Sequence, residues 1–191
     1  MVVPSLSSSM SKPELRSAMR IARKSYASSL SPTERTKLQD SLASLLRPLV
    51  ERAGAVGGYH AIGNEIDVAP VLALAEHHGL PAFDEGLAIF QFRRGPASVR
   101  GPHGIPQPNA ESPILDCGLV LVPLLAIDPK GHRLGQGGGH FDRALPALRE
   151  AGATLIGVGW EMQRLDFDLP HEPWDVALDG FASPAGMEMF R

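Results

Sequence analysis

The 191-residue chain has one cysteine, Cys117, so no disulfide can form within it. That usage fits a reducing compartment, and we expect the protein to be cytoplasmic. No apolar run approaches the roughly 20 residues of a membrane-spanning helix, so we expect no membrane partner. The net charge of −3 argues against a broad nucleic-acid surface and leaves room for a local basic pocket.

The remaining bulk properties are those of an ordinary globular protein, with 43% hydrophobic and 20% charged residues. Residues 1–10 are serine-rich and lack the basic start and long apolar core of a secretory signal. We expect residues 1–10 to be a disordered tail. The length suits one domain, which we place at residues 11–191.

Apolar runs alternate with helical patterns along the chain, which predicts an α/β domain with a mainly parallel sheet. The run at 119–125 is continuously apolar, as in a strand buried on both faces. Further strands are predicted at 53–60, 80–83, 87–92, 154–159 and 177–181. Helices are predicted after the capping boxes at Ser11 and Ser31, the second disturbed or ended at Pro48, and over 68–78 and 144–151. The Gly- and Pro-rich segment 95–113 is predicted to be an irregular loop.

The most informative stretch is residues 131–143, GHRLGQGGGHFDR, which holds five glycines and follows the apolar run. A strand, a glycine-rich loop and a helix in this order let backbone N–H groups surround a phosphate. Arg133 and Arg143 add donors for charge-assisted hydrogen bonds. Asp142 is placed either to cap the following helix or to hold magnesium. The alternative is a surface turn in a glycine-rich protein.

Two common nucleotide-binding motifs are absent from this stretch. The pattern G-x-x-x-x-G-K-[ST] does not occur, so the loop is not a P-loop. The dinucleotide fingerprint requires a glycine at position 140, where His140 stands.

A second basic feature lies on the first predicted helix. Lys12, Arg16, Arg20 and Arg23 recur at helical spacing without interleaved acids. A solvated helix face is the alternative, but a face of one sign is suited to an anion.

The pattern R-L-G-x-G-G-G-x-F-D-R resembles the signature of the 5-formyltetrahydrofolate cyclo-ligase family, also called methenyltetrahydrofolate synthetases. Other landmarks of that family follow in order from Lys12 to Ser183. The resemblance implies a three-layer α/β/α sandwich, similar to sugar-phosphate isomerase and CoA transferase-like folds. It also implies that ATP drives conversion of 5-formyltetrahydrofolate to 5,10-methenyltetrahydrofolate, with release of ADP and phosphate.

The resemblance also implies roles for individual residues. Asp142 and Asp175 are implied to bind magnesium. Tyr59, Glu65 and Phe141 are implied to border the folate, and Glu65 is implied to orient its pterin. Residues that act at the transferred phosphate are Arg133, His140 and Phe141, with His140 as a proton shuttle or a neutral hydrogen-bonding group. ATP contacts are implied for Lys12, Arg16, Arg20, Arg133, Leu134, Gly135, Gln136, Gly137, Gly138, Gly139, His140 and Phe141. From the residues alone, the alternative for Glu65 is a first-turn acid that favours a helix dipole, and the alternative for Asp175 is a loop or cap residue.

The chain departs from the family pattern at four places. Gln136 and His140 stand where tyrosines are common, Gln107 replaces a glutamate, and Phe141 lacks a tyrosine's hydroxyl. Two other functions therefore stay open: a non-catalytic nucleotide- or folate-binding protein, or an isomerase or transferase acting on a phosphorylated or CoA-linked substrate. The latter's nucleophile would be Glu65. We expect a monomer or small homo-oligomer.

Overall fold

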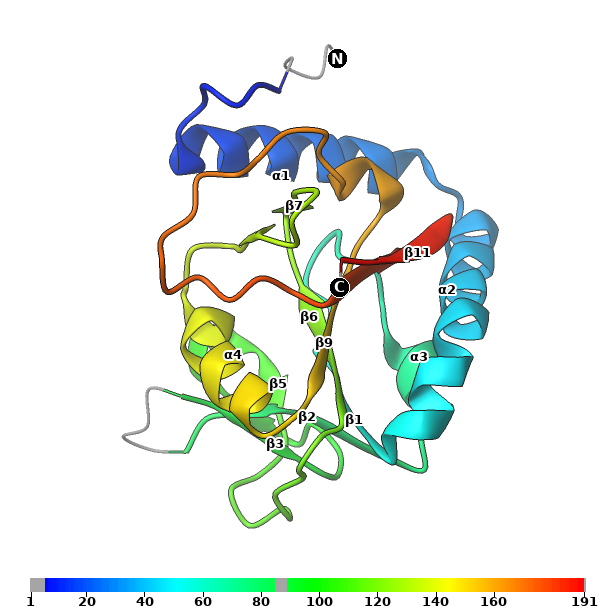
Figure 1. Ribbon diagram of the computed structural model, residues 1–191. Helices are drawn as coiled ribbons and strands as arrows, with labels where there is room; N and C mark the ends of the chain where they lie inside the picture. Colours follow the sequence, from blue (N-terminus) through cyan, green and yellow to red (C-terminus); the bar gives the residue numbers. More distant parts are fainter. Residues whose placement is uncertain (1–5, 85–88, 191) are drawn as a thin grey trace.

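Seven strands form the central sheet of the computed structural model, which describes residues 6–84 and 89–190 (Figure 1). Their order is β11-β10-β9-β6-β1-β2-β3. Strands β10, β9, β6, β1 and β2 run parallel, and the edge strands β11 and β3 are antiparallel to their neighbours. The strand bounds are Ala55–Gly57 (β1), His77–Ala82 (β2), Gln91–Arg93 (β3), Leu119–Pro123 (β6), Thr154–Val158 (β9), Gly180–Ser183 (β10) and Gly186–Met189 (β11). The mainly parallel sheet is confirmed.

Helices cover both faces of this sheet, which confirms the three layers (Figure 1). The helices are α1 (Lys12–Ser29), α2 (Pro32–Ala53), α3 (Ala69–Leu72) and α4 (His140–Glu150). Helices α2 and α3 lie on one face and α4 on the other. Strand β6 packs Leu119 and Leu121 toward α2, and Val120 and Val122 toward α4. This alternation explains why the run is apolar throughout.

Helix α1 crosses above the carboxyl end of β6 (Figure 1). Its Leu15 and Met19 are fully buried against Leu125 and Leu134, from the hairpin of β7 (Ala126–Ile127) and β8 (Arg133–Leu134). The predicted capping boxes hold α1 and α2 at their starts, where Glu14 and Glu34 accept backbone N–H bonds at 2.8 Å. The N-terminal helix is therefore fixed over the edge of the sheet at which parallel strands end.

The structure describes only residues 6–10 of the predicted N-terminal tail. Residues 1–5 lie outside the described residues, whereas Leu6 and Met10 pack against the same cluster as Leu15. Within the described ranges, no helix is both long and apolar enough to cross a membrane.

The helix predicted over 68–78 is wrong for most of its length. Helix α3 ends at Leu72, and turns lead into β2, which begins at His77. His77 and His78 pair in parallel with Ala55 and Val56 of β1. Sheet pairing thus outweighs local helical periodicity, and the two histidines belong to a strand.

Other boundaries also differ from the prediction. Pro48 lies inside α2, which continues to Ala53 because Leu46 and Val50 on either side are buried in the core. The strand predicted at 87–92 is β3, and residues 85–88 lie outside the described part. The loop 95–113 contains the short strands β4 (Val99–Arg100) and β5 (Pro106–Gln107), and the final strand β11 was not predicted.

Candidate functional site

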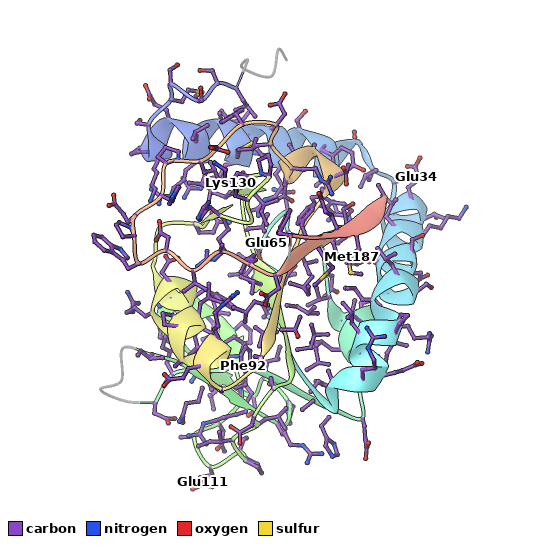
Figure 2. The ribbon with its side chains drawn as sticks, in the orientation of Figure 1. Glu34, Glu65, Phe92, Glu111, Lys130 and Met187 are labelled. Carbon is purple, nitrogen blue, oxygen red and sulfur yellow. The ribbon has the colours of Figure 1, made fainter. Side chains whose placement is uncertain are left out.

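A cavity of about 630 Å³ opens where the carboxyl ends of β1, β2 and β6 face α1 and the glycine-rich loop. This is the edge at which open parallel sheets bind ligands. Figure 2 places Glu65, part of the cavity wall, near the centre of the molecule below α1. Predicted site residues in the wall are Arg20, Tyr59, Glu65, Arg133, Gly135, Gln136, Gly137, Gly138, Gly139, His140, Phe141 and Asp142. The fold therefore unites most of the predicted phosphate and folate residues.

The glycine-rich loop joins β8 to α4 and is held in place from α1. Arg16 Nε donates to the Gly135 carbonyl at 3.0 Å, and Arg20 Nη2 donates to the Gln136 carbonyl at 2.7 Å. Gly139 precedes α4 with φ = 67°, a conformation that glycine adopts without strain. The loop thus ends at a helix N-terminus, whose N–H groups suit an anion.

Arg133 is a buried cation of the site. Its side chain is 5% exposed and pairs with Asp142, while its Nε has no hydrogen-bond partner among the described residues. Burial lowers the pKa of the guanidinium, and the charges of Asp142 and Asp175 oppose that shift. Because a buried donor without a partner is costly, Nε is a candidate contact for an anionic ligand. A side chain at Gly135 would place its Cβ 2.7 Å from Arg133 Nη1, so the end of the Arg133 side chain would have to shift to accommodate it.

A second ion pair lies beside Arg133. Lys12 Nζ is 3.2 Å from Asp175 Oδ2, which joins the first turn of α1 to the loop that precedes β10. Partial burial disfavours the charged form of Asp175, but a hydrogen bond from the Glu172 N–H, Lys12 and Arg133 together lower its pKa. Lys12 and Asp175 are not among the residues that line the cavity. They lie close to Arg133 but outside the space that contains Glu65.

Glu65 is 9% exposed and accepts contacts on both oxygens. Oε2 accepts the Ile62 N–H at 2.9 Å, and Oε1 lies 3.2 Å from Gln136 Nε2 and 3.5 Å from Arg23 Nη1. Arg23 is 6% exposed and also donates to the Leu124 carbonyl at 3.3 Å. Burial lowers the pKa of Arg23, and the charge of Glu65 opposes that shift.

Arg23 is a site residue that sequence reasoning did not assign. Its place on the basic stripe of α1, at helical spacing from Arg16 and Arg20, was the available signal. The spacing does not show which of these arginine side chains is buried beside the cavity.

Tyr59 lines the cavity with its ring, and its hydroxyl donates to the Ile66 carbonyl at 2.9 Å. Burial raises the pKa of the hydroxyl well above its usual range. Tyr59 therefore offers a neutral, mainly apolar surface to a ligand.

Aromatic side chains form another part of the cavity wall. Phe141 packs edge-to-face on Phe90 with ring centroids 5.0 Å apart, and His140 packs in the same way on Phe83 at 4.9 Å. Rings in this arrangement suit a flat, partly apolar ligand.

Leu134 and Asp142 are placed differently from what their predicted roles require. Leu134 packs its side chain into the core beside α1, so only its backbone is available to a ligand. Asp142 lies within the first turn of α4, whose cap is Gly139, so the capping alternative is wrong.

The predicted magnesium ligands do not form an all-protein cage. Across residues 6–84 and 89–190, no three histidine, cysteine or acidic side chains converge as metal ligands. The charges of Asp142 and Asp175 nevertheless both act on the buried Arg133, with which Asp142 forms an ion pair. One or two carboxylates beside a phosphate site fit magnesium, which takes its other ligands from phosphates and water.

Comparison with known proteins agrees with this geometry. The model of the 5-formyltetrahydrofolate cyclo-ligase family matches residues 8–184. An Escherichia coli K12 protein named 5-formyltetrahydrofolate cyclo-ligase is 25% identical over 170 residues, which cover 82% of this chain and 93% of that protein. A Haemophilus influenzae protein of the same name is 38% identical over 66 residues, and that match spans 35% of its length.

Solved structures show the same relationship. The Aquifex aeolicus 5,10-methenyltetrahydrofolate synthetase superposes with a TM-score of 0.75 at 30% identity, covering 95% of this chain and 94% of that one. The synthetase from Mycoplasma pneumoniae shares the fold, with a TM-score of 0.69 at 22% identity over 92% of this chain and 99% of that one. Because the family model and the Aquifex structure both span nearly the whole chain, the protein belongs to the 5-formyltetrahydrofolate cyclo-ligase family.

Proposed function

We propose that this protein converts 5-formyltetrahydrofolate to 5,10-methenyltetrahydrofolate, with ATP hydrolysed to ADP and phosphate. The observation that carries the proposal is the position of Arg133. Its buried guanidinium, whose Nε lacks a partner among the described residues, lines the Glu65 cavity, and the charge of Asp175 from the Lys12–Asp175 pair acts on it. A group in that position contacts a phosphoryl group as it passes from a nucleotide to a substrate held in the cavity.

The chemistry requires activation of a poor leaving group. The formyl oxygen attacks the γ-phosphorus of ATP, the bond to the β-phosphate oxygen breaks, and ADP leaves. The folate N10 amine then attacks the activated formyl carbon, loses its proton, and the C–O bond breaks to release phosphate. Such a transfer depends on positioning and charge neutralisation more than on a protein nucleophile.

Cations and amides around the loop suit the phosphates. Arg133 supplies charge-assisted hydrogen bonds from a site with little water, where they are strong. Lys12 approaches from the first turn of α1, and the amides of 135–139 add donors. Arg16 and Arg20 donate to loop carbonyls, so we assign them to holding the loop in shape.

Glu65 is suited to the pterin. A carboxylate accepts two hydrogen bonds from an amino-pyrimidine edge, and Glu65 is fixed by Ile62 and Arg23. The Gln136 amide occupies Oε1 at 3.2 Å and must move for the pterin to take that oxygen. Tyr59, His140 and Phe141 all line the cavity. We assign Tyr59 and Phe141 to the folate rings and His140 to the reacting formyl group.

We assign magnesium to Asp142 and Asp175, since the charges of both carboxylates act on Arg133. The ion supplies charge neutralisation at the transferred phosphate. Arg133 and Lys12 hold these two carboxylates in place. The cytoplasm remains our proposed compartment.

The transferase alternative is less consistent with the site. A nucleophilic Glu65 needs an oxygen that can attack, but both oxygens accept contacts, and Arg23 stabilises the charge. No observation favours a non-catalytic binding protein over the enzyme.

The test follows the absorbance of the methenyl product. The protein is mixed with 5-formyltetrahydrofolate, magnesium and ATP, with ATP-free and magnesium-free controls and a parallel assay for ADP. We expect a rise that depends on ATP, with one ADP formed per methenyl product. ATP that binds without any rise would contradict the proposed reaction and favour the binding-protein alternative.

A further inference from the structure

The two tryptophans of the chain have opposite environments. Trp160 is fully buried, whereas Trp174 is 73% exposed. Tryptophan is on average a highly buried residue, so a ring this exposed calls for a reason. Trp174 directly precedes Asp175, the partner of Lys12.

The backbone beneath Trp174 is held in a defined turn. The Asp175 N–H donates to the Glu172 carbonyl at 2.9 Å, and the Glu172 N–H donates to Asp175 Oδ2 at 2.9 Å. Pro173 lies inside this turn and restricts it further. Lys12 then ties the turn to α1 at 3.2 Å. The ring is therefore presented from a fixed support.

The place of the turn relative to the phosphate site is equally specific. Arg133 and Asp142 line the Glu65 cavity, but Lys12, Trp174 and Asp175 do not. The charge of Asp175 nevertheless acts on Arg133. A nucleotide whose γ-phosphate meets Arg133 at the cavity must place its nucleoside on the other side of that phosphate, because the pterin fills the cavity. The Lys12–Asp175 side is where Trp174 stands.

We propose that Trp174 is the platform on which the adenine base of ATP stacks, an inference that rests on the proposed function. Stacking of a base on an aromatic ring strengthens binding about 5- to 150-fold in single-strand nucleic-acid complexes. The interaction uses the ring face and therefore tolerates either purine. Trp174 thus sets affinity for the nucleotide, and the folate site and the chemical step do not depend on it.

Fluorescence offers a direct test, because Trp160 is buried and only Trp174 is open to a ligand. The wild-type protein with magnesium is titrated with ATP, without folate, and separately with tripolyphosphate, which carries the phosphates and no base. Calorimetry on the same samples reports binding. We expect ATP to quench the emission and tripolyphosphate to bind without quenching. Trp174→Phe, which retains Trp160, should show no response to ATP.

Kinetics give an independent readout. Trp174→Ala should raise the KM for ATP about tenfold, within the range that stacking energies imply. Its kcat and its KM for 5-formyltetrahydrofolate should stay within about twofold of wild type. Trp174→Phe should restore most of the ATP affinity because it restores a ring. Ile114→Ala, at a site 53% exposed and away from the cavity, is the matched control and should leave every constant unchanged.

The outcomes separate the two proposals. ATP binding and turnover without quenching, or an unchanged KM for ATP in Trp174→Ala, overturn the stacking role and leave the reaction intact. ATP that fails to bind the wild-type protein by calorimetry, with no methenyl product, overturns the proposed function and the stacking role with it. Equal quenching by tripolyphosphate would mean that loop movement, and not base stacking, alters Trp174.

Discussion

Gln107 pairs with the backbone of Phe83 as a neighbouring strand would. Its Nε2 donates to the Phe83 carbonyl at 3.0 Å, and its Oε1 accepts the Phe83 N–H at 3.1 Å. The side chain is 8% exposed, so both bonds are shielded from water. The family pattern has a glutamate at this position, which could accept the N–H but not donate to the carbonyl while ionised. Only an amide side chain provides both the donor and the acceptor that this contact uses. The two hydrogen bonds attach segment 102–107 to the chain just after β2, along the cavity wall.

Gln107→Glu should therefore destabilise the fold. The change removes one buried donor and sets a carboxylate against a carbonyl oxygen, which we expect to lower the free energy of unfolding by about 1–3 kcal/mol at pH 7. Urea denaturation measures this loss. Asn109→Asp is the matched control, because Asn109 uses its Oδ1 to accept the Glu111 N–H and an aspartate keeps that acceptor. Equal stability of Gln107→Glu and wild type would show that the pairing with Phe83 contributes nothing.

Replacement of Arg133 tests the proposed phosphate site. Arg133→Lys keeps a charge but loses the planar fork that pairs with Asp142, and we expect kcat/KM for ATP to fall roughly 10- to 150-fold. Arg133→Ala should lose more, because Asp142 is then left beside the phosphates without its cation. Steady-state methenyl formation at varied ATP gives both numbers. Arg47→Ala, an exposed arginine on α2, should behave as wild type, and unchanged ATP kinetics in Arg133→Ala would remove Arg133 from the mechanism.

The buried pair of Glu65 and Arg23 predicts a separable effect. Glu65→Gln should raise the KM for 5-formyltetrahydrofolate and leave that for ATP near wild type. It should also lower stability by about 3 kcal/mol, since Arg23 loses its counter-charge while 6% exposed.

The double variant Glu65→Gln/Arg23→Met distinguishes these two effects. Removing the buried cation should recover much of the stability, measured by thermal denaturation, without recovering folate affinity. Recovery of both together would mean that Glu65 acts through Arg23 and does not contact the folate.

Sequence patterns predicted the elements whose signals are local. The capping boxes at Ser11 and Ser31 and the doubly buried β6 lie where the spacing placed them. The failures depend on distant partners. His77 and His78 continue a helical pattern, yet pairing with β1 makes them a strand.

The site also combines features with a local sequence signal and features that depend on distant partners. Residues 131–143 indicated the loop that lines the cavity, because its five glycines lie close together in sequence. The contacts that organise it join residues far apart: Lys12 and Asp175 are separated by 163 positions, and Arg23 and Glu65 by 42. For residues so far apart in the chain, the separation in sequence does not determine the distance between their side chains. Neither ion pair was therefore predictable before the fold was known.

Cys117 gives a prediction on pH. Burial, with a smaller effect of Asp116, raises the pKa of its thiol to about 12. Since the thiolate is the reactive form, iodoacetamide at pH 9 should label the folded protein at least a hundredfold more slowly than the urea-unfolded one. The folded pKa lies above the unfolded value, so this thiol's contribution to stability is complete below about pH 8.5 and is lost as pH rises toward 12. Thermal denaturation at pH 8 and 10.5 should therefore show a larger decline for wild type than for Cys117→Ala, in which other titrating groups are unchanged. Rapid labelling of the native protein, or equal declines in the two proteins, would show that the thiol is not held protonated by the fold.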